Sequence, residues 1–345
     1  MLKQKLKKGE PMDEKLKKLT EKKRQLDKLR PLPPEQVKNI QEWLDVEYTY
    51  TSNAIEGSTL NRSETALVIE KGITVRGKTL REHLEATNHA KAIDFVRSIV
   101  EKGHQFITED DIKNIHKIVL AGIDDDWAGK YRLRQVFITG APQEPPRPEE
   151  VPHRMKKLVE WLKDQQGVHP VKVTADLHYR FVVIHPFVDG NGRTTRLLMN
   201  LVLMQNGYPI TIIKTEEREA YIDAIRKGTV TGDLDDFYSL VFGAVERSLD
   251  AYIAAAKGKS IIPFFIEKTE LVSENLLQIG KVATLANVGI PTVRYYIAQG
   301  FIKPETKSKG GFMLFDPKVV EKIKEIKRLQ KEDRLSIAEI KKRLS

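Results

Sequence analysis

Apolar side chains recur every three or four positions along most of the chain, which is the period of an amphipathic helix. A narrow stripe of four leucines lies among the charged residues of 13–30, and the prolines at 31, 33 and 34 end this helix. The same period predicts helices over 35–50, 62–72, 80–101 and 108–120, and across most of 149–252. The expected fold class is therefore mainly α.

One segment breaks the helical pattern. Residues 130–139 (KYRLRQVFIT) alternate and are rich in β-forming side chains, which predicts a strand or one arm of a hairpin. Four prolines follow within 140–148 and exclude a helix there. We expect one β-hairpin on an otherwise helical core.

The composition is that of a folded protein. The chain has 345 residues, of which 40% are hydrophobic and 31% charged, enough for about two domains. It has no cysteine, which excludes a disulfide framework, a thiolate nucleophile and a cysteine metal site. No apolar run is long enough for a membrane helix, and the lysine-rich start lacks a signal-peptide core. The sequence therefore predicts a soluble, cytoplasmic protein with no membrane partner.

The net charge of +10 is concentrated at the two ends. Residues 1–30 hold 12 Lys and Arg against 5 Asp and Glu, and residues 271–345 hold 15 against 8. The part between them is slightly acidic. Any contact with nucleic acid is therefore expected at an end, although lysine-rich solvated helices explain the same charges.

The segment HPFVDGNGRTTR, residues 185–196, has the features of an anion site. A helix over 172–184 is expected to end at Pro186, and another is expected to begin at Arg193. The turn Gly190-Asn191-Gly192 between them lets the backbone approach a ligand. The first-turn amides of Arg193, Thr194 and Thr195 would lack partners within the helix and point at that ligand. Polyphosphate is the commonest occupant of such a site.

The side chains of this segment fit the same chemistry. Arg193 and Arg196 lie three apart on one helical face, where both can reach phosphate oxygens. Asp189 is a hard oxygen ligand of the kind that Mg²⁺ prefers. His185 titrates near neutrality and can accept a proton from an attacking hydroxyl. Each feature alone has a plain structural explanation, but together within twelve residues they indicate a catalytic site.

This segment resembles the motif of the Fic family, H-x-F-x-D/E-G-N-G-R-x-x-R, and all eight fixed positions are present. The likeness extends over about residues 25–250. Fic enzymes typically transfer AMP from ATP to a Ser, Thr or Tyr hydroxyl of a protein. The resemblance thus implies ATP as substrate, Mg²⁺ as cofactor, and a protein acceptor or the chain itself. Gly192 favours nucleotide transfer over the phosphorylation carried out by Doc-like members.

The resemblance also implies a role for each residue of the motif. His185 would be the general base, and Asp189 would hold Mg²⁺ on the phosphates. The loop 190–193 would cradle the phosphates, with Asn191 near the α-phosphate. Arg193 would lie toward the β-phosphate and Arg196 toward the γ-phosphate.

Residues 130–139 resemble the family's flap, a hairpin that holds the target segment as an added strand. Thr139 on this flap and Tyr221 are candidates for holding the adenine base of ATP. Tyr221 is equally a candidate for a packing residue. The stretch 85–95 and the helix around His116 are also family-like, and packing explains both. Because the family often forms dimers, a homodimer stays open.

The stretch SNAIEG, Ser52–Gly57, is on its own a helix end with Gly57 as its cap. Its spacing resembles the inhibitory helix of the family, S/T-x-x-x-E-G/N. There the Glu, here Glu56, pairs with the second motif Arg, here Arg196, and displaces the γ-phosphate. In some relatives the same Glu positions a water that removes AMP again, so AMP removal is a second expected activity.

The basic C-terminal end predicts a helix-turn-helix with a wing: helices over 281–287 and 291–299, followed by a Gly-rich hairpin. It resembles the DNA-binding head of the MerR regulators. Carried over, Arg294 and Tyr295 would contact DNA, with Lys307 and Lys309 on the wing. Where that wing often carries an Arg, this chain has Gly311, Phe312 and Met313, so a protein-docking winged helix stays open.

Together these features predict five segments: a basic helix (1–30), a helical segment with the inhibitory motif (31–75), a Fic core with its flap (76–256), a linker (257–278) and a winged helix-turn-helix (279–345). The predicted function is an autoinhibited protein AMP-transferase. The alternative is a DNA-binding regulator whose Fic core senses nucleotide. The presence of His185 argues against that alternative, because a sensor needs no base.

Overall fold

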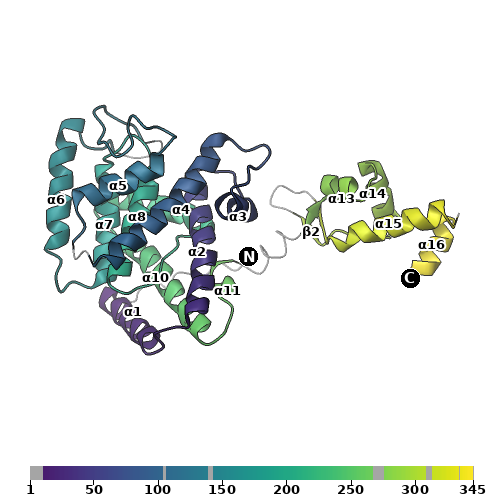
Figure 1. The fold of residues 1–345 in the computed structure, drawn as a ribbon, viewed down its shortest axis with the longest axis horizontal. Helices are drawn as coiled ribbons and strands as arrows, with labels where there is room; N and C mark the ends of the chain where they lie inside the picture. Colours follow the sequence, from purple (N-terminus) through teal and green to yellow (C-terminus); the bar gives the residue numbers. More distant parts are fainter. Residues whose placement is uncertain are drawn as a thin grey trace. The chain divides into compact units, whose positions relative to one another are not determined.

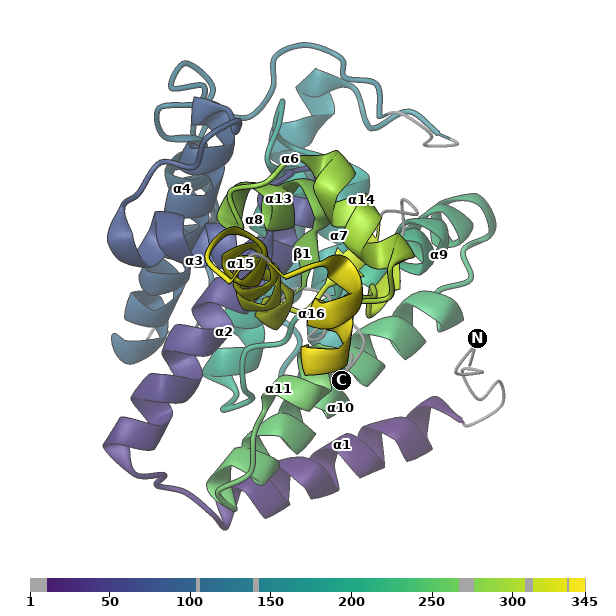
Figure 2. The ribbon, with the colours of Figure 1, turned by 90° about the vertical axis from the view of Figure 1, so that its right-hand side faces the viewer.

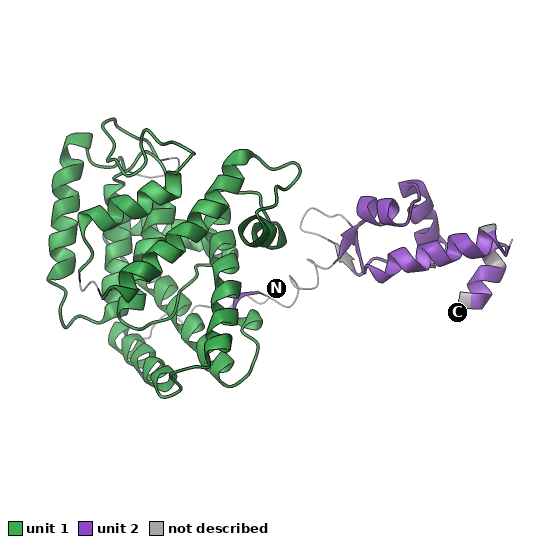
Figure 3. Ribbon diagram, in the orientation of Figure 1, with its two compact units in different colours: residues 1–264 green, residues 265–345 purple. Residues whose placement is uncertain are grey.

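The computed structural model describes residues 11–103, 106–138, 143–266, 276–307, 313–333 and 335–344. These form two compact units, residues 1–264 and 265–345 (Figure 3). Regular structure in both units is mainly helical, which confirms the predicted fold class (Figure 1). Within the described residues no helix has both the length and the apolar composition to cross a membrane.

The first unit is built from helices and two short 3-10 turns. Its elements are α1 (Met12–Asp27), α2 (Pro34–Ile55), α3 (Arg62–Lys71), α4 (Leu80–Glu101), α5 (Glu109–Leu120), η1 (Pro148–Glu150), α6 (Val151–Lys163), α7 (Pro170–Ile184), α8 (Asn191–Gln205), η2 (Thr215–Glu217), α9 (Arg218–Thr231) and α10 (Asp235–Ala256).

Helix α8 lies at the centre of this unit. Its residues are almost all buried from Asn191 to Leu203, because α7, α4, α5 and α2 pack around it (Figure 1). A helix that is buried on every side belongs to a core rather than a surface. The first residues of α8 belong to the predicted anion site, so that site begins at the end of the most buried element.

The basic helix α1 packs along α10 (Figure 2). Leu19 and Leu26 of its predicted stripe are buried in one cluster with residues of α10. Lys22 forms ion pairs with Glu246 and Asp250 of α10. Part of the N-terminal charge is thus compensated within the protein, which favours the structural explanation of that charge over nucleic-acid contact.

The predicted strand over 130–139 is not formed in residues 130–138, and position 139 lies outside the described residues. Leu133 and Phe137 are 82% and 76% exposed, so the alternating apolar side chains face solvent. A two-stranded hairpin is marginal without a third strand or a core to cover it. The prolines at 145, 146 and 148 also remove backbone donors that a partner arm would need.

In its described residues, the second unit contains four helices and a small antiparallel sheet. Its elements are β1 (Leu277–Gln278), α13 (Ile279–Leu285), α14 (Ile290–Ala298), β2 (Thr306–Lys307), β3 (Met313–Phe315), α15 (Lys318–Lys331) and α16 (Ile337–Leu344). The strand order is β1-β3-β2, with Leu277 opposite Phe315 and Thr306 opposite Leu314. Val282, Val293 and Phe315 lie in its core.

Within its described residues, the predicted linker 257–278 contains regular structure at two places. Helix α11 (Ile262–Phe265) lies within it, and β1 closes it. Phe265 and Ile266 are buried, because this part of the segment is an apolar run rather than a polar one. Residues 267–275 lie outside the described residues.

Candidate active site

The loop between α7 and α8 is held in one conformation by its own side chains. His185 caps α7 in the left-handed region, with φ 49° and ψ 59°, and Gly190 caps α8 with φ 74°. The side chain of Asn191 accepts the N–H of Phe187 at 3.0 Å and donates to its carbonyl at 2.9 Å. The amide side chain expected near the α-phosphate is therefore used to close this loop.

Helix α8 begins two residues earlier than predicted, at Asn191 instead of Arg193. The N–H of Thr194 already donates to the carbonyl of Gly190 at 2.9 Å, and the Thr194 side chain is buried. The predicted use of the Thr194 and Thr195 amides is therefore wrong. The first-turn amides of an α-helix that starts here belong to residues 191–193, which keeps the anion site but moves it back along the chain.

Asp189 and Arg193 lie together beside this helix end. Arg193 is only 2% exposed, with Nη2 3.6 Å from Asp189 Oδ1 and Nη1 3.2 Å from Glu85 Oε1. Asp189 also forms an ion pair with Arg81. Burial alone would raise the pKa of Asp189, but the charges of Arg193 and Arg81 and the N–H of Gly190 lower it below its usual value. The carboxylate is thus fixed in its ionised form.

Arg196 brings the distant segment Ser52–Gly57 to the site. It is 1% exposed and donates from Nε to Ser52 Oγ at 2.9 Å, and from Nη2 to the Ser52 carbonyl at 2.8 Å. The same Nη2 lies 2.7 Å from Glu56 Oε1. A Cβ built on Gly192 would lie 2.1 Å from that carboxylate oxygen. The Glu56 carboxylate therefore lies directly against the start of α8.

His185 depends on Arg132, a residue that the sequence did not single out. The buried Arg132 side chain donates from Nε to the His185 carbonyl at 2.8 Å, and its backbone N–H donates to the Pro186 carbonyl at 3.0 Å. Burial, together with the charge of Arg132, lowers the pKa of His185 to about 4. The imidazole is neutral at pH 7, as a general base requires.

His116 of α5 holds the loop between α7 and α8 through a hydrogen bond and a ring contact. Gly129 donates its N–H to Nδ1 at 2.9 Å, so Nε2 carries the ring proton and donates to the Asp189 carbonyl at 2.9 Å. The ring stacks on Phe187 with 3.6 Å between centroids. The sequence offered packing as the explanation for His116, and the structure adds this hydrogen bond. No local pattern indicates it, because the partners are far apart in the chain.

Comparison with known proteins agrees with this geometry. Residues 106–203 match the sequence model of the Fic/DOC family. A solved Fic-domain-containing signaling protein from Bacteroides thetaiotaomicron is 32% identical, with a TM-score of 0.65 over 72% of this chain and 98% of that one. The chain belongs to the Fic/DOC family.

Curated relatives are protein adenylyltransferases by name. The chain is 38% identical over 230 residues to protein adenylyltransferase Fic of Nematostella vectensis, covering 66% of this chain and 52% of that protein. It is 38% identical over 216 residues to protein adenylyltransferase fic-1 of Caenorhabditis elegans, covering 62% and 42%. A solved structure of C. elegans Fic-1 has a TM-score of 0.63 and 33% identity over 71% of this chain and 73% of that one. The chain spans about half the length of the curated relatives it matches.

The Fic site offers little protein ligation for a metal. In the described parts of the chain no group of three His, Cys, Asp or Glu residues is placed to hold one. Asp189, with its side chain partly open to solvent, supplies a single carboxylate beside the anion site. Mg²⁺ is commonly bound by one or two carboxylates together with substrate phosphates, so this donor set fits Mg²⁺ that arrives with a nucleotide.

Two further candidates of the Fic core have different outcomes. Tyr221 is buried in the core cluster, with its hydroxyl 2.7 Å from His178 Nε2. Its ring therefore has no free face on which the adenine base of ATP could stack. The packing explanation of Tyr221 is therefore the better one. Thr139 lies outside the described residues.

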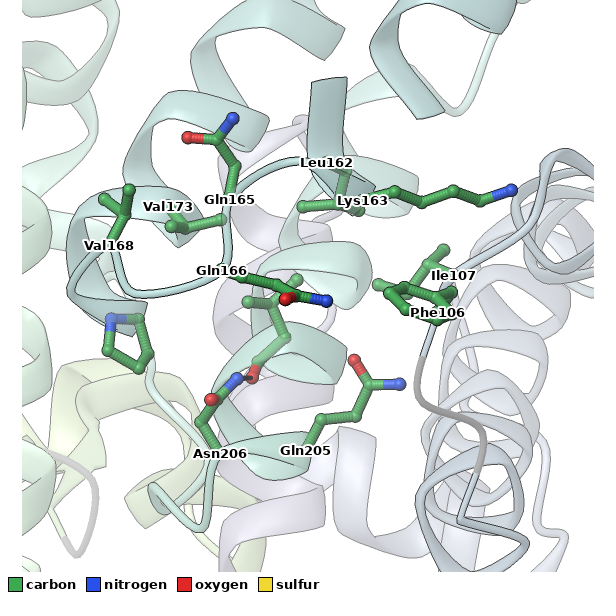
Figure 4. A pocket seen from close by; sticks show the side chains of 12 residues that line it. Phe106, Ile107, Leu162, Lys163, Gln165, Gln166, Val168, Val173, Gln205 and Asn206 are labelled. Atoms are coloured by element: carbon green, nitrogen blue, oxygen red, sulfur yellow. Dashed lines mark hydrogen bonds between the residues drawn. The ribbon is translucent and has the colours of Figure 1, made fainter. Parts of the chain in front are cut away.

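Two hollows of the Fic core lie away from the motif. One of about 180 Å³ is lined by residues that include Phe106, Leu162 and Val173 (Figure 4). The other, of about 560 Å³, lies beside Pro31, Met204 and Tyr252. Neither is lined by any residue of 185–196 or by Glu56, so neither is part of the site described above.

The C-terminal unit is a candidate nucleic-acid interface. Residues 277–345 match the sequence model of the MerR HTH family regulatory proteins. Arg294 and Tyr295 are exposed on α14, as a recognition helix requires. Lys307 lies in strand β2, and Lys309 lies outside the described residues.

Proposed function

We propose that the chain transfers AMP from ATP, with Mg²⁺, to a hydroxyl of a protein, and that Glu56 restrains this activity. The observation that carries the proposal is the grouping at one end of α8. Neutral His185, the amides of residues 191–193 and the buried guanidiniums of Arg193 and Arg196 all lie there. Phosphoryl-type transfer depends chiefly on positioning and on neutralising charge, which these groups supply.

In the proposed reaction the acceptor oxygen attacks the α-phosphorus, and the bond from that phosphorus to the pyrophosphate leaving group breaks. His185 takes the hydroxyl proton, so the oxygen gains nucleophilic strength as the new ester bond forms. Arg193 and the first-turn amides of α8 stabilise the charge on the phosphates. Asp189 would hold Mg²⁺, which supplies further positive charge when it is bound with the nucleotide.

Glu56 is proposed as the brake. Its carboxylate contacts the Arg196 guanidinium, which the γ-phosphate also needs. Two negative groups cannot share that guanidinium, so ATP is left misaligned for attack. The same carboxylate is the proposed group for the removal of AMP.

The test is self-labelling with ATP carrying a label on the α-phosphate, measured in wild type and in variants of Glu56, His185 and Arg196. Glu56→Gly should label much faster than wild type, whereas His185→Ala in the Glu56→Gly background should not label. Arg196→Ala should stay slow with or without Glu56→Gly. His153→Ala, which changes an exposed histidine of α6, is the control. Unchanged labelling in His185→Ala would contradict the mechanism, and equal labelling in Glu56→Gly and wild type would contradict the brake.

We also propose DNA as a partner of the C-terminal unit, supported by the exposed Arg294 and Tyr295 and by the MerR match. The full chain should shift duplex DNA at low salt, and its affinity should fall steeply as salt rises. Arg294→Ala should weaken binding by about 1–3 kcal/mol if it reads a base edge, whereas Arg154→Ala on α6 should not. If no DNA is shifted at low salt, protein docking becomes the better assignment. DNA binding without any AMP transfer would favour a regulator with a nucleotide-sensing core.

A further inference from the structure

The first turn of α4 closes a ring of charges with the motif loop. Arg81 donates from Nη2 to Asp189 Oδ2 and from Nε to Glu85 Oε1, the latter at 3.1 Å. Glu85 Oε1 lies 3.2 Å from Nη1 of Arg193, and Arg193 Nη2 lies 3.6 Å from Asp189 Oδ1. Two acids and two guanidiniums thus alternate in this ring, and one of the acids, Asp189, is the carboxylate that is proposed to hold the metal.

Both oxygens of Asp189 are engaged in this ring. Oδ1 accepts the N–H of Gly190 at 2.5 Å and faces Arg193, whereas Oδ2 accepts a hydrogen bond from Arg81. Arg81 therefore covers the oxygen that Gly190 and Arg193 do not contact. A divalent ion that approaches Oδ2 meets a positive charge at contact distance, and two cations on one oxygen repel each other strongly.

The two guanidiniums differ in their freedom to leave. Arg193 is buried, whereas the Arg81 side chain is 56% exposed. Arg81 can therefore swing into solvent while Glu85 stays close to Arg193. The contact between Arg81 and Asp189 is therefore the contact of the ring that breaks most easily.

We propose that Arg81 is a built-in counter-cation for Asp189: it covers the metal-facing oxygen while no nucleotide is bound and must leave when Mg²⁺ arrives with ATP. Arg81 is then a positioning residue that sets how strongly Mg²⁺ promotes nucleotide binding. This inference rests on the proposed function of the site. Because the contact is a partly exposed ion pair, the effect is modest, about two- to fivefold in affinity.

The test measures binding of ATP to the full chain by calorimetry, once with Mg²⁺ and once with EDTA. The background is Glu56→Gly with His185→Ala, which opens the site and prevents turnover. Arg81→Ala should bind ATP about two- to fivefold more tightly with Mg²⁺, and equally or more weakly with EDTA. Arg76→Ala, which removes an exposed arginine from the loop before α4, is the matched control and should equal the background in both conditions.

Three results would overturn the inference. If Arg81→Ala weakens ATP binding with Mg²⁺, Arg81 is a phosphate ligand. If it changes neither condition, the ring has no consequence for the metal. If Arg76→Ala has the same effect, the cause is general surface charge. Because binding is measured without turnover, a failure of AMP transfer would contradict the proposed function and leave this test intact.

Discussion

His185 adopts a backbone conformation that is unfavourable for a residue other than glycine. Its φ of 49° costs about 1–2 kcal/mol, and the proline that follows restricts it further. Arg132 offsets this cost by holding the carbonyls of His185 and Pro186 from a buried position. The proposed base is thus positioned by a residue of the segment 130–138, which is distant in the sequence.

Arg132→Ala should therefore slow AMP transfer by about a hundredfold, because a small displacement of a reacting group has an effect of that size. The measurement is the single-turnover labelling rate in the Glu56→Gly background, with a melting curve to show that the variant is folded. Arg134→Ala, which changes an exposed arginine of the same segment, should label at the parent rate. Equal rates in the two variants would show that Arg132 does not position His185.

The buried His178 makes the free energy of unfolding depend on pH. Burial, together with the charge of Arg196, lowers the pKa of His178 to about 3. An unfolded histidine has a pKa of about 6.5, so the unfolded state binds the proton first. The stability that neutral His178 contributes is complete above pH 6.5 and is lost as the pH falls toward 3, by up to about 1.4 kcal/mol per pH unit.

His178→Gln should accordingly flatten the dependence of the free energy of unfolding on pH between about pH 6 and 4.5. Urea unfolding at several pH values measures this slope. His153→Gln on the surface of α6 should leave it unchanged. An unaltered slope in His178→Gln would mean that His178 does not account for this part of the pH dependence.

At the scale of elements, the position of Glu56 depends on how the chain leaves α2. Thr59 donates both its N–H, at 2.8 Å, and its hydroxyl, at 2.6 Å, to Glu82 Oε1 of α4. Arg62, three residues after Thr59 in the chain, forms an ion pair with the buried Glu47 of α2. The proposed brake is therefore fastened to the first turn of α4, which also carries Arg81.

Glu82→Ala should raise AMP transfer several-fold in the wild-type background, because the segment after Glu56 loses two hydrogen bonds. In the Glu56→Gly background it should produce no rise, since no brake remains to be loosened. Glu82 also closes the capping box at the start of α4 with Thr79, so Asp111→Ala, which removes the equivalent capping box of α5, serves as the control. A rise of the same size in both backgrounds would place the effect outside the brake.

The elements with an unbroken helical period were predicted well from the sequence, α4 being the clearest case. Helix α2 runs to Ile55 rather than residue 50, and the added residues Thr51, Ser52, Asn53 and Ile55 are buried, so tertiary packing extends the helix beyond its local apolar period. The predicted strand failed because a strand needs a partner that the local pattern does not supply. The motif 185–196 predicted a loop that opens onto a helix carrying Arg193 and Arg196, and the structure has this arrangement, whereas the roles of these residues toward phosphate stay a prediction. Arg81 and Arg132, at 108 and 53 residues from their partners, could not be predicted, because only the fold brings them to the loop.

At the scale of the whole molecule, each unit has a core of its own. Tyr221 and Phe237 lie in one cluster, and Val293 and Phe315 lie in the other. Each unit also has the size of an ordinary domain. We therefore expect the two units to unfold in separate transitions.

Scanning calorimetry should show two transitions for the full chain. Ile323→Val in the C-terminal core should lower the free energy of unfolding of that unit by about 0.5–1.5 kcal/mol. The temperature of one transition should fall by several degrees, because that unit is small. Ile115→Val in the Fic core should lower only the other one. A shift of both transitions by either substitution would show that the units unfold together.

Glu56 and Arg196 belong to one chain, and this gives the proposed brake a property that a separate inhibitor lacks. A ligand tethered by a short segment acts at a fixed effective concentration, which for short flexible links is in the millimolar range. That concentration does not change with the amount of protein, so the restraint is the same in dilute and concentrated solution. It does change with the length and stiffness of residues 57–61, which fasten the end of α2 to α4. Insertion of residues into that short stretch would therefore change how strongly the Glu56 carboxylate competes with the triphosphate of ATP for Arg196. The atoms of the catalytic loop would stay in place.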